Sequence, residues 1–281
     1  MQICRSTQDM RAWRKTAGTV ALVPTMGALH DGHLSLVARA RDWLDAEGGG
    51  RVVTSIFVNP TQFGAAEDLD QYPRSEAQDL DMLAGAGCDA VFLPQVADIY
   101  RPGAQTHVEV TGLGRMLMGR LRPGHFRGVA TVVTKLFNIL QPQAAVFGEK
   151  DYQQITLIRQ MVADLDIPVQ ILAGPTVRDA DGLALSSRNQ RLTPEDRVAA
   201  PVLARALDRA QAMVAKGTTP TALRRAIRDL LAAEPRARIR SIDIRDAGDL
   251  SRVAALDRPV VILLAVRFGD VLLIDQRVAH P

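Results

Sequence analysis

Short apolar runs alternate with longer segments of helical periodicity through the first two-thirds of the chain. The runs are rich in β-branched residues and are bounded by turn-forming residues, which is typical of buried strands. Strands are expected at residues 20–23, 52–58, 90–93, 107–110, 144–147 and 169–172. Helices are expected at residues 34–43, in the second part of 68–83, at 129–140 and at 155–162. This alternation predicts an α/β fold with a mostly parallel sheet and helices on both faces.

The final third of the chain has a different pattern. Two amphipathic segments rich in alanine and arginine, 194–216 and 218–233, predict helices. Strand-like runs follow at 239–245, 260–267 and 271–274, and Phe268-Gly269-Asp270 is typical of a hairpin turn. We therefore expect two domains, residues 1–176 with the parallel sheet and residues 177–281 as a smaller α+β domain with an antiparallel sheet.

The composition is that of an ordinary globular protein, with 281 residues that are 47% hydrophobic and 23% charged. Basic residues exceed acidic ones only slightly, 34 against 31, which argues against a nucleic-acid partner. No apolar run approaches the roughly 18 residues of a membrane span, and the first residues lack the apolar core of a signal peptide. Cys4 and Cys88 form no close-spaced pair, so we expect a reduced, cytoplasmic setting.

A glycine-bearing turn follows the first of these strands and carries His30 and His33 where the next helix begins. A helix start gathers unpaired N–H groups and a partial positive charge, which favour phosphate. Two imidazole donors beside it would stabilise the charge that develops when a phosphorus is attacked. Two alternatives stay open at this point: a zinc site, which usually needs a third ligand and another spacing, and a pair of ordinary surface histidines.

Polar segments also follow two other expected strands. Asn59 and Gln62 pair donors with acceptors that would orient a hydroxyl or carboxylate, and the alternative is an ordinary Asn-Pro turn. Lys150, near a helix start, would meet a phosphate as a point charge. Its neighbours Glu149 and Asp151 would equally serve as helix caps beside a solvated lysine.

Two further segments are basic or rich in hydroxyl groups. The run 185–189 offers two hydroxyls and a guanidinium, either as a clamp for phosphate oxygens or as a polar linker. The run 122–128 suggests a mobile loop near an anionic ligand. The sequence has no convincing nucleophile arrangement, no Walker A loop and no dinucleotide fingerprint. It therefore favours a phosphate-rich ligand and chemistry by positioning and charge stabilisation.

Six segments, in this order and covering nearly the whole chain, closely resemble the pantoate–β-alanine ligase family. They are Pro24-Thr-Met-Gly-Ala-Leu-His-Asp-Gly-His33, Ser55-Ile-Phe-Val-Asn-Pro-Thr-Gln-Phe63, Tyr72-Pro-Arg74, Arg122-Pro-Gly-His-Phe-Arg-Gly128, Phe147-Gly-Glu-Lys-Asp-Tyr-Gln-Gln154 and Gly182-Leu-Ala-Leu-Ser-Ser-Arg-Asn189. The segment from Arg267 to Asp275 is also similar. The His-x-Gly-His motif alone is shared by a wider nucleotidyl-transferase group, whereas the six segments together are specific.

The resemblance implies a Rossmann-like domain and two half-reactions. The carboxylate of (R)-pantoate attacks the α-phosphorus of ATP, which gives pantoyl adenylate and pyrophosphate. The amine of β-alanine then attacks the adenylate, which gives pantothenate and AMP. Mg²⁺ is expected with ATP, held through phosphates and water; its protein ligands stay unassigned, although Asp79 lies where relatives sometimes carry an acidic pair. A homodimer and a C-terminal lid that excludes water are expected as well.

The resemblance also assigns site residues. The catalytic residues would be His33, as the acid, with His30, Lys150 and Arg188. The ATP-binding residues would be Met26, Gly27, Ala28, Leu29, His30, Asp31, Gly32, His33, Gly148, Glu149, Lys150, Asp151, Val177, Leu185, Ser186, Ser187 and Arg188. Gln62 and Gln154 would bind pantoate, and Gln62 would also bind β-alanine.

The chain departs from the family pattern at two positions where relatives have methionine. Thr61 is expected to loosen the packing around pantoate slightly, and Leu185 is a volume-conserving change expected to be silent. Three rival functions are weaker. The Gln62 and Gln154 pair argues against an adenylyltransferase that stops after pyrophosphate release, and the intact polar motifs argue against an inactive nucleotide-binding regulator. The lack of a basic extension argues against a tRNA-charging enzyme.

Overall fold

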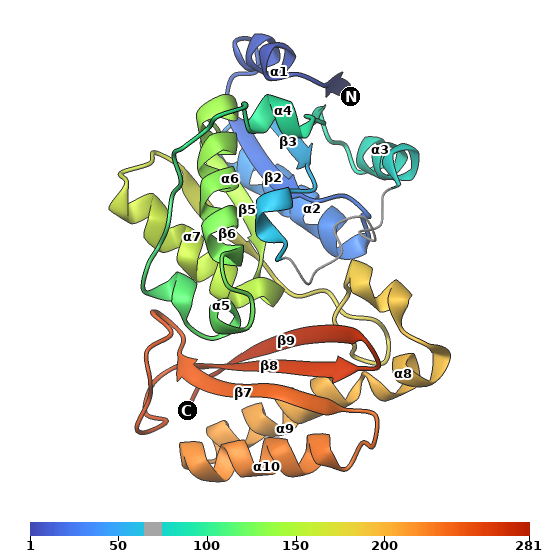
Figure 1. The fold of residues 1–281 in the computed structure, drawn as a ribbon, viewed down its shortest axis with the longest axis vertical. Coiled ribbons are helices and arrows are strands. Elements are labelled where there is room, and N and C mark those ends of the chain that lie inside the picture. Colours follow the sequence, from blue (N-terminus) through green and yellow to red (C-terminus); the bar gives the residue numbers. More distant parts are fainter. Residues whose placement is uncertain (65–74) are drawn as a thin grey trace. The chain divides into compact units, whose positions relative to one another are not determined.

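The computed structural model describes residues 1–64 and 75–281, so the Tyr72-Pro-Arg74 segment lies outside the described residues. The chain divides into two compact units. The first comprises residues 1–148 and 153–174, and the second comprises residues 149–152 and 175–281. Figure 1 labels most of their helices and strands.

The first unit is built on a six-stranded parallel sheet in the order β1-β4-β3-β2-β5-β6. The strands are β1 Gln2–Cys4, β2 Val20–Thr25, β3 Arg51–Ile56, β4 Ala90–Phe92, β5 Ala144–Gly148 and β6 Gln170–Gly174. From β2 the chain adds β3 and β4 on one side, and later adds β5 and β6 on the other. The strand order therefore reverses between β2 and β5.

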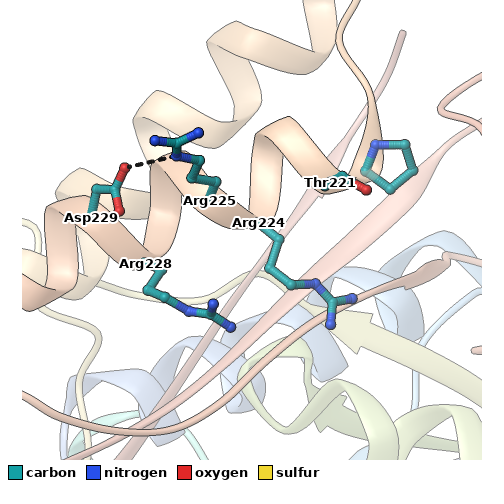
Figure 2. A pocket seen from close by; sticks show the side chains of 6 residues that line it. Thr221, Arg224, Arg225, Arg228 and Asp229 are labelled. Carbon is teal, nitrogen blue, oxygen red and sulfur yellow. Dashed lines mark ion pairs between the residues drawn. The ribbon is translucent and has the colours of Figure 1, made fainter.

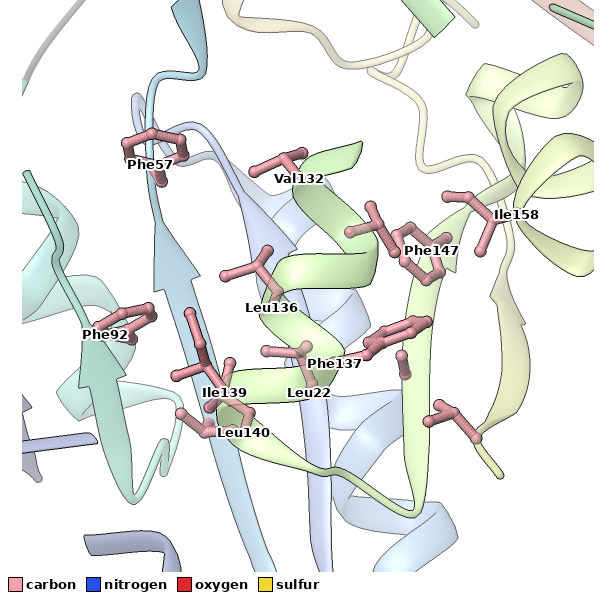
Figure 3. Close-up of a cluster of buried hydrophobic side chains, with 14 of the residues drawn as sticks. Leu22, Phe57, Phe92, Val132, Leu136, Phe137, Ile139, Leu140, Phe147 and Ile158 are labelled. Atoms are coloured by element: carbon pink, nitrogen blue, oxygen red, sulfur yellow. The ribbon is translucent and has the colours of Figure 1, made fainter. Parts of the chain in front are cut away.

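Helices cover both faces of this sheet. They are α1 Thr7–Arg14, α2 Asp31–Ala46, α3 Glu76–Gly85, α4 Val96–Ile99, α5 Met118–Leu121, α6 His125–Leu140 and α7 Tyr152–Asp164, with 3-10 turns η1 Pro60–Gln62 and η2 Leu113–Arg115. Successive side chains of a strand point to opposite faces. Accordingly, Leu22 joins the core under α6 and α7, part of which Figure 3 shows, while Val23 joins the core under α2.

The second unit packs helices on a three-stranded antiparallel sheet in the order β7-β8-β9. Its elements are η3 Glu149–Asp151, η4 Ser187–Arg191, α8 Pro194–Ala199, α9 Val202–Ala215, α10 Pro220–Ala232, β7 Arg238–Asp246, β8 Val260–Phe268 and β9 Val271–Ala279. Phe268 pairs with Val271, so the predicted hairpin turns through Gly269 and Asp270. Gly269 has a φ of +52°, a left-handed conformation that glycine adopts readily.

The predicted α/β architecture with a separate antiparallel sheet is confirmed, but two predicted elements are wrong. The expected strand at 107–110 is irregular, because the Val108 amide donates to Thr131 Oγ1 on α6, at 3.0 Å, instead of to a neighbouring strand. The single helix expected over 194–216 is two helices, α8 and α9. Pro201 lies between them, where it has no N–H to continue the helical hydrogen bonding.

Candidate functional site

The predicted site segments of the first unit lie beyond the carboxyl ends of neighbouring strands. The turn 26–30 follows β2, and η1 with its cap Asn59 follows β3. Gly148 is the last residue of β5, which neighbours β2 on its other side. Ligands of open parallel sheets bind at such a point, where the strand order reverses.

The turn after β2 has an unusual backbone that the sequence permits. Gly27 has a φ of +82° and Ala28 a φ of +50°, so the chain passes through two left-handed residues before α2 begins. A Cβ on Gly27 would lie 3.0 Å from Asp79 Oδ2 and 3.1 Å from Ile56 Cγ2. Glycine at this position therefore meets both a conformational and a spatial requirement.

The carboxylate of Asp79, on α3, holds this turn in place. Its two oxygens accept hydrogen bonds from the backbone N–H groups of Ala28 and Leu29, each at 2.9 Å. Asp79 is only 2% exposed. Ser75 Oγ donates a third hydrogen bond, at 3.0 Å. Charge-assisted bonds of this kind are about twice as strong as neutral ones. Asp79 is thus a structural clamp on the turn 26–30, a role that sequence reasoning missed.

His30 and His33 begin α2 and hold each other in a reciprocal cap. His30 Nδ1 accepts the Gly32 N–H at 3.1 Å, and His33 Nδ1 accepts the His30 N–H at 3.3 Å. The two rings lie close, with centroids 4.1 Å apart and planes tilted by 41°. Because Nδ1 is an acceptor in both rings, the proton of each neutral imidazole is assigned to Nε2. Both histidines therefore carry an Nε2–H donor at a helix N-terminus.

The side chain of Gln62 is oriented by Asn59, which is 1% exposed. Asn59 Oδ1 accepts hydrogen bonds from the Thr61 N–H at 3.3 Å, the Thr61 hydroxyl at 2.9 Å and the Tyr100 hydroxyl at 2.9 Å. Burial raises the pKa of Tyr100, so its hydroxyl stays protonated and able to donate. Asn59 Nδ2 donates to the Gly128 carbonyl at 3.2 Å and to Gln62 Oε1 at 2.8 Å.

This network fixes which end of the Gln62 amide is committed to the protein. Amide oxygen and nitrogen are hard to distinguish by shape, but a backbone N–H can only donate and a carbonyl can only accept. Those two backbone partners set the orientation of Asn59, and Asn59 in turn takes Oε1 of Gln62 as its acceptor. The donor end, Nε2, is left for recognition of an oxygen atom.

The backbone of Gln62 is held from the basic segment that the sequence singled out. His125 Nδ1 donates to the Gln62 carbonyl at 2.8 Å, and Arg122 Nη2 approaches the same carbonyl at 3.4 Å. Arg122 Nη1 lies 3.2 Å from His125 Nε2, which assigns Nε2 as the acceptor and the ring proton to Nδ1. Gly128 makes the closest approach, since a Cβ there would lie 2.4 Å from the Thr61 carbonyl oxygen. Arg122 and His125 therefore support the backbone of Gln62.

Two adjacent glutamines of α7 have different surroundings. Gln154 is half-buried, on the first turn of the helix that follows β5. Gln153 is buried, and its amide accepts from the Met118 N–H at 3.0 Å and donates to the Leu113 and Met116 carbonyls at 2.8 Å. Gln153 thus holds the loop around residues 113–118 in place. Gln154 is the member of the pair that could contact a ligand.

The other predicted residues belong to the second unit. Lys150 lies in η3, with Nζ 3.6 Å from Asp151 Oδ2 and a side chain 16% exposed. Val177 and Leu185 face each other in a short hairpin, where the Leu185 N–H donates to the Val177 carbonyl at 2.9 Å. Ser186 caps η4 by accepting the Arg188 N–H at 3.3 Å. Each of these segments thus has contacts within itself.

A pocket of the second unit lies on α10. Figure 2 shows its lining, which is Pro220, Thr221, Arg224, Arg225, Arg228 and Asp229. Arg225 and Asp229 pair at 3.8 Å, but both are exposed, and such helix-surface pairs contribute only about 0.3–0.5 kcal/mol. The pocket contains none of the residues that the sequence selected.

Residues 1–64 and 75–281 hold no group of three or more histidine, cysteine, aspartate or glutamate side chains arranged to bind a metal ion. The zinc alternative for His30 and His33 therefore has no third ligand within the described part of the chain. None of the described helices combines the length and the apolar character needed to cross a bilayer.

Comparisons with known proteins agree with the geometry. The family model for pantoate-beta-alanine ligase matches residues 2–278. A pantothenate synthetase from Agrobacterium fabrum is 50% identical over 284 residues, covering 99% of this chain and 96% of that protein. A relative of the same name from Herpetosiphon aurantiacus is 50% identical over 280 residues, covering 99% of this chain and 100% of that protein.

Solved structures give the same result. The crystal structure of pantothenate synthetase from Thermus thermophilus superimposes with a TM-score of 0.94 at 43% identity, covering 100% of both chains. A pantoate-beta-alanine ligase from Francisella tularensis, complexed with beta-gamma ATP and beta-alanine, gives a TM-score of 0.80 at 34% identity, covering 99% of this chain and 97% of that one. With the family model matched almost from end to end, the chain belongs to the pantoate–β-alanine ligase family.

Proposed function

We propose that the chain catalyses the ATP-dependent condensation of (R)-pantoate with β-alanine to pantothenate, through pantoyl adenylate, with release of pyrophosphate and AMP. The observation that carries the proposal is the donor set of the first unit. Two imidazoles present Nε2–H groups at the start of α2, and the Gln62 amide is held with Nε2 as its available end. The relative that was crystallised with beta-gamma ATP and beta-alanine supports two of the three ligands.

The adenylation step needs stabilisation of charge at the α-phosphorus. A carboxylate oxygen of pantoate forms the new O–P bond, and pyrophosphate leaves with the electrons of the broken P–O bond. The turn 26–33 would receive the phosphates through its helix-start N–H groups and the imidazole donors. His33, which the resemblance assigns as the acid, would donate a hydrogen bond from Nε2–H to a phosphate oxygen, with His30 beside it. Met26, Gly27, Ala28, Leu29, Asp31 and Gly32 complete the proposed lining of this side.

The second unit would supply the remaining nucleotide contacts. Lys150 and Arg188 are the proposed cations that neutralise the departing pyrophosphate. The other proposed contacts are Gly148, which ends β5 of the first unit, and Glu149, Asp151, Val177, Leu185, Ser186 and Ser187. In this proposal residues 177–281 act as the lid that protects the adenylate from water.

The organic substrates would be recognised by the two glutamines. Gln62 Nε2 would donate to an oxygen of pantoate, and Gln154 would bind the same molecule from the start of α7. Gln62 would then also contact β-alanine. In the second step the β-alanine amine forms the C–N bond and loses a proton, and AMP leaves with the electrons of the acyl C–O bond. The intermediate forms on the substrate, so this route uses no nucleophile of the protein.

Three further features belong to the proposal. Mg²⁺ would enter with ATP and be held by phosphate oxygens and water. Asp79 is the first residue to consider as a protein ligand of Mg²⁺, but both of its oxygens accept hydrogen bonds from backbone N–H groups. Its contacts therefore favour a structural role over metal binding. A homodimer rests on the resemblance alone. A cytoplasmic setting is favoured by the two buried free thiols, Cys4 and Cys88.

Release of pyrophosphate and AMP from ATP, Mg²⁺ and pantoate, with and without β-alanine, tests the proposal. Pyrophosphate limited to about one equivalent of enzyme without β-alanine, followed by sustained AMP formation with it, is the result expected of a two-step ligase. Sustained pyrophosphate release without β-alanine would instead indicate an adenylyltransferase. ATP binding with no pantoate-dependent pyrophosphate in either mixture would refute the ligase and favour a regulator or another carboxylate substrate.

His33→Ala should abolish pyrophosphate release while leaving the fold intact, because the imidazole accepts the His30 N–H and lies against the His30 ring in a polar turn. His280→Ala removes an exposed imidazole near the end of the chain and is the matched control. Circular dichroism would verify folding of both variants. Near-normal turnover in His33→Ala would remove that residue from its assigned role.

A further inference from the structure

The hairpin that carries Val177 and Leu185 is closed by regular backbone pairing. Arg178 and Ala184 form an antiparallel bridge, and the Asp179 N–H donates to the Leu183 carbonyl at 2.8 Å. At the tip Gly182 has a φ of +89°, and a Cβ there would lie 3.2 Å from the Cβ of Ala204 on α9. A loop of nine residues with one short ladder has little stability of its own. Its position must therefore be set by contacts with the rest of the second unit.

Arg178 supplies the strongest of these contacts. Its Nη1 and Nη2 donate to Oδ2 and Oδ1 of Asp275 on β9, at 2.7 and 2.9 Å, in a two-pronged ion pair. The same guanidinium donates to the Gly182 carbonyl at 3.0 Å and to the Gln276 carbonyl at 3.4 Å. One side chain thus spans the hairpin and attaches it to the sheet. The planar fork of arginine allows this geometry, whereas lysine would bind as a point charge.

A second arginine holds the hairpin from α8, but more weakly. Arg197 pairs with Asp179 and with Asp181, and its guanidinium lowers the pKa of Asp181. Those two carboxylates are 39% and 43% exposed, whereas the side chain of Asp275 is 2% exposed. Exposed pairs contribute little because water screens them, while breaking a buried pair leaves an uncompensated charge. The pair on β9 is therefore the one whose loss should move the hairpin.

We propose that Arg178 and Asp275 are positioning residues of the nucleotide site. They hold the hairpin 177–185 on β9, and so fix the positions of Val177, Leu185 and the start of η4, which follows the hairpin. The inference rests on the proposed function, because it takes those residues as ATP contacts. Neither Arg178 nor Asp275 is assigned a contact with ATP. Their effect on the ligand is transmitted through the backbone that they fix, and a displacement of about 1 Å is enough to weaken a bound geometry substantially.

Arg178→Lys tests this with little risk to folding, since it keeps the charge and loses the fork. Asp275→Asn is the second variant, similar in shape but without the charge. Arg277→Lys is the matched control, because Arg277 lies on the same strand and pairs at 2.8 Å with Asp208 on α9, which is not a residue of the hairpin. Each protein is measured without pantoate, by calorimetric titration with ATP and Mg²⁺ and by amide hydrogen exchange of the segment 177–185.

We expect both hairpin variants to bind ATP about tenfold more weakly, a change of about 1.4 kcal/mol, and to exchange the Asp179 and Leu185 amides faster. The control should match the wild type in both measurements. Unchanged exchange in the hairpin, or faster exchange with unchanged ATP affinity, would overturn the inference. A wild-type chain that binds ATP but forms no pantothenate would refute the proposed function and leave this inference to stand or fall on the ATP titration.

Discussion

The sharpest test of the site is a single substitution that reverses the polarity of one side chain. Asn59→Asp keeps the size of the residue and retains the oxygen that accepts from Thr61 and Tyr100. It replaces the donor Nδ2 with a second oxygen, 2.8 Å from Gln62 Oε1 and 3.2 Å from the Gly128 carbonyl. Gln62 can relieve the clash by turning its amide over. Oε1 would then face the substrate in place of Nε2.

The magnitude follows from the contacts that change. A lost hydrogen bond to a charged group is worth about 1.5–3 kcal/mol, which corresponds to a fall of about 10- to 150-fold in kcat/KM for pantoate. The Gly128 carbonyl cannot turn over, so a buried acceptor is left facing a carboxylate, at a cost of about 1–3 kcal/mol in the free energy of unfolding. ATP affinity should stay within about twofold, since the turn 26–33 is held by Asp79 and not by Asn59.

The assay is steady-state kinetics with each substrate varied in turn, together with urea unfolding. Tyr100→Phe is the control, because it removes one donor to Asn59 Oδ1 and leaves the backbone N–H and the Thr61 hydroxyl to keep the orientation. Its kcat/KM for pantoate should fall by less than about fivefold, the effect of a neutral hydrogen bond. A folded Asn59→Asp protein with wild-type kcat/KM for pantoate would refute the assigned amide orientation. Equal losses in the two variants would also refute it, because they would show a packing effect.

Two further predictions test the supports of the site. Asp79→Asn should lower kcat/KM for ATP by about 10-fold and reduce stability by about 1–3 kcal/mol, because one amide oxygen cannot replace two carboxylate oxygens toward Ala28 and Leu29; unchanged ATP kinetics would show that the turn keeps its shape without the clamp. Gly128→Ala should destabilise the first unit by at least about 1–3 kcal/mol and reduce pantoate use, because its Cβ would overlap the Thr61 carbonyl; a melting temperature equal to that of the wild type would contradict the close packing of α6 on η1.

The sequence predicted the elements whose signal is local. A short apolar run bounded by turn residues identifies β2, β3 and β5 because burial on both faces needs a continuous apolar stretch. β1 was missed, since it has only three residues and its partner β4 is almost ninety residues away. The false strand at 107–110 had the right alternation, but strand formation depends on a free partner edge, and Thr131 supplied another acceptor. The local pattern of residues contains no information about a distant partner strand or a competing hydrogen-bond acceptor.

The same division separates the site residues that the sequence identified from those it missed. His30, Gln62 and Lys150 follow strands directly, so the expected strand ends located them. Asp79 and Tyr100 act on segments far from them in sequence, at separations of 50 and 41 residues for the Leu29 and Asn59 contacts. Thr61 was expected to loosen packing around pantoate. In the structure the Thr61 hydroxyl donates to Asn59, a hydrogen bond that a methionine could not make.

The supports found here share one physical device, which explains why they were invisible in the sequence. Asp79 accepts hydrogen bonds from two backbone N–H groups, His125 donates to the carbonyl of Gln62, and Arg178 donates to the carbonyl of Gly182. A support that binds backbone leaves the polar side chains of the loop available for a ligand. It also makes the shape of each loop depend on residues from other elements of the same unit. Changes at the supports should therefore weaken ligand binding without altering any group that touches the ligand.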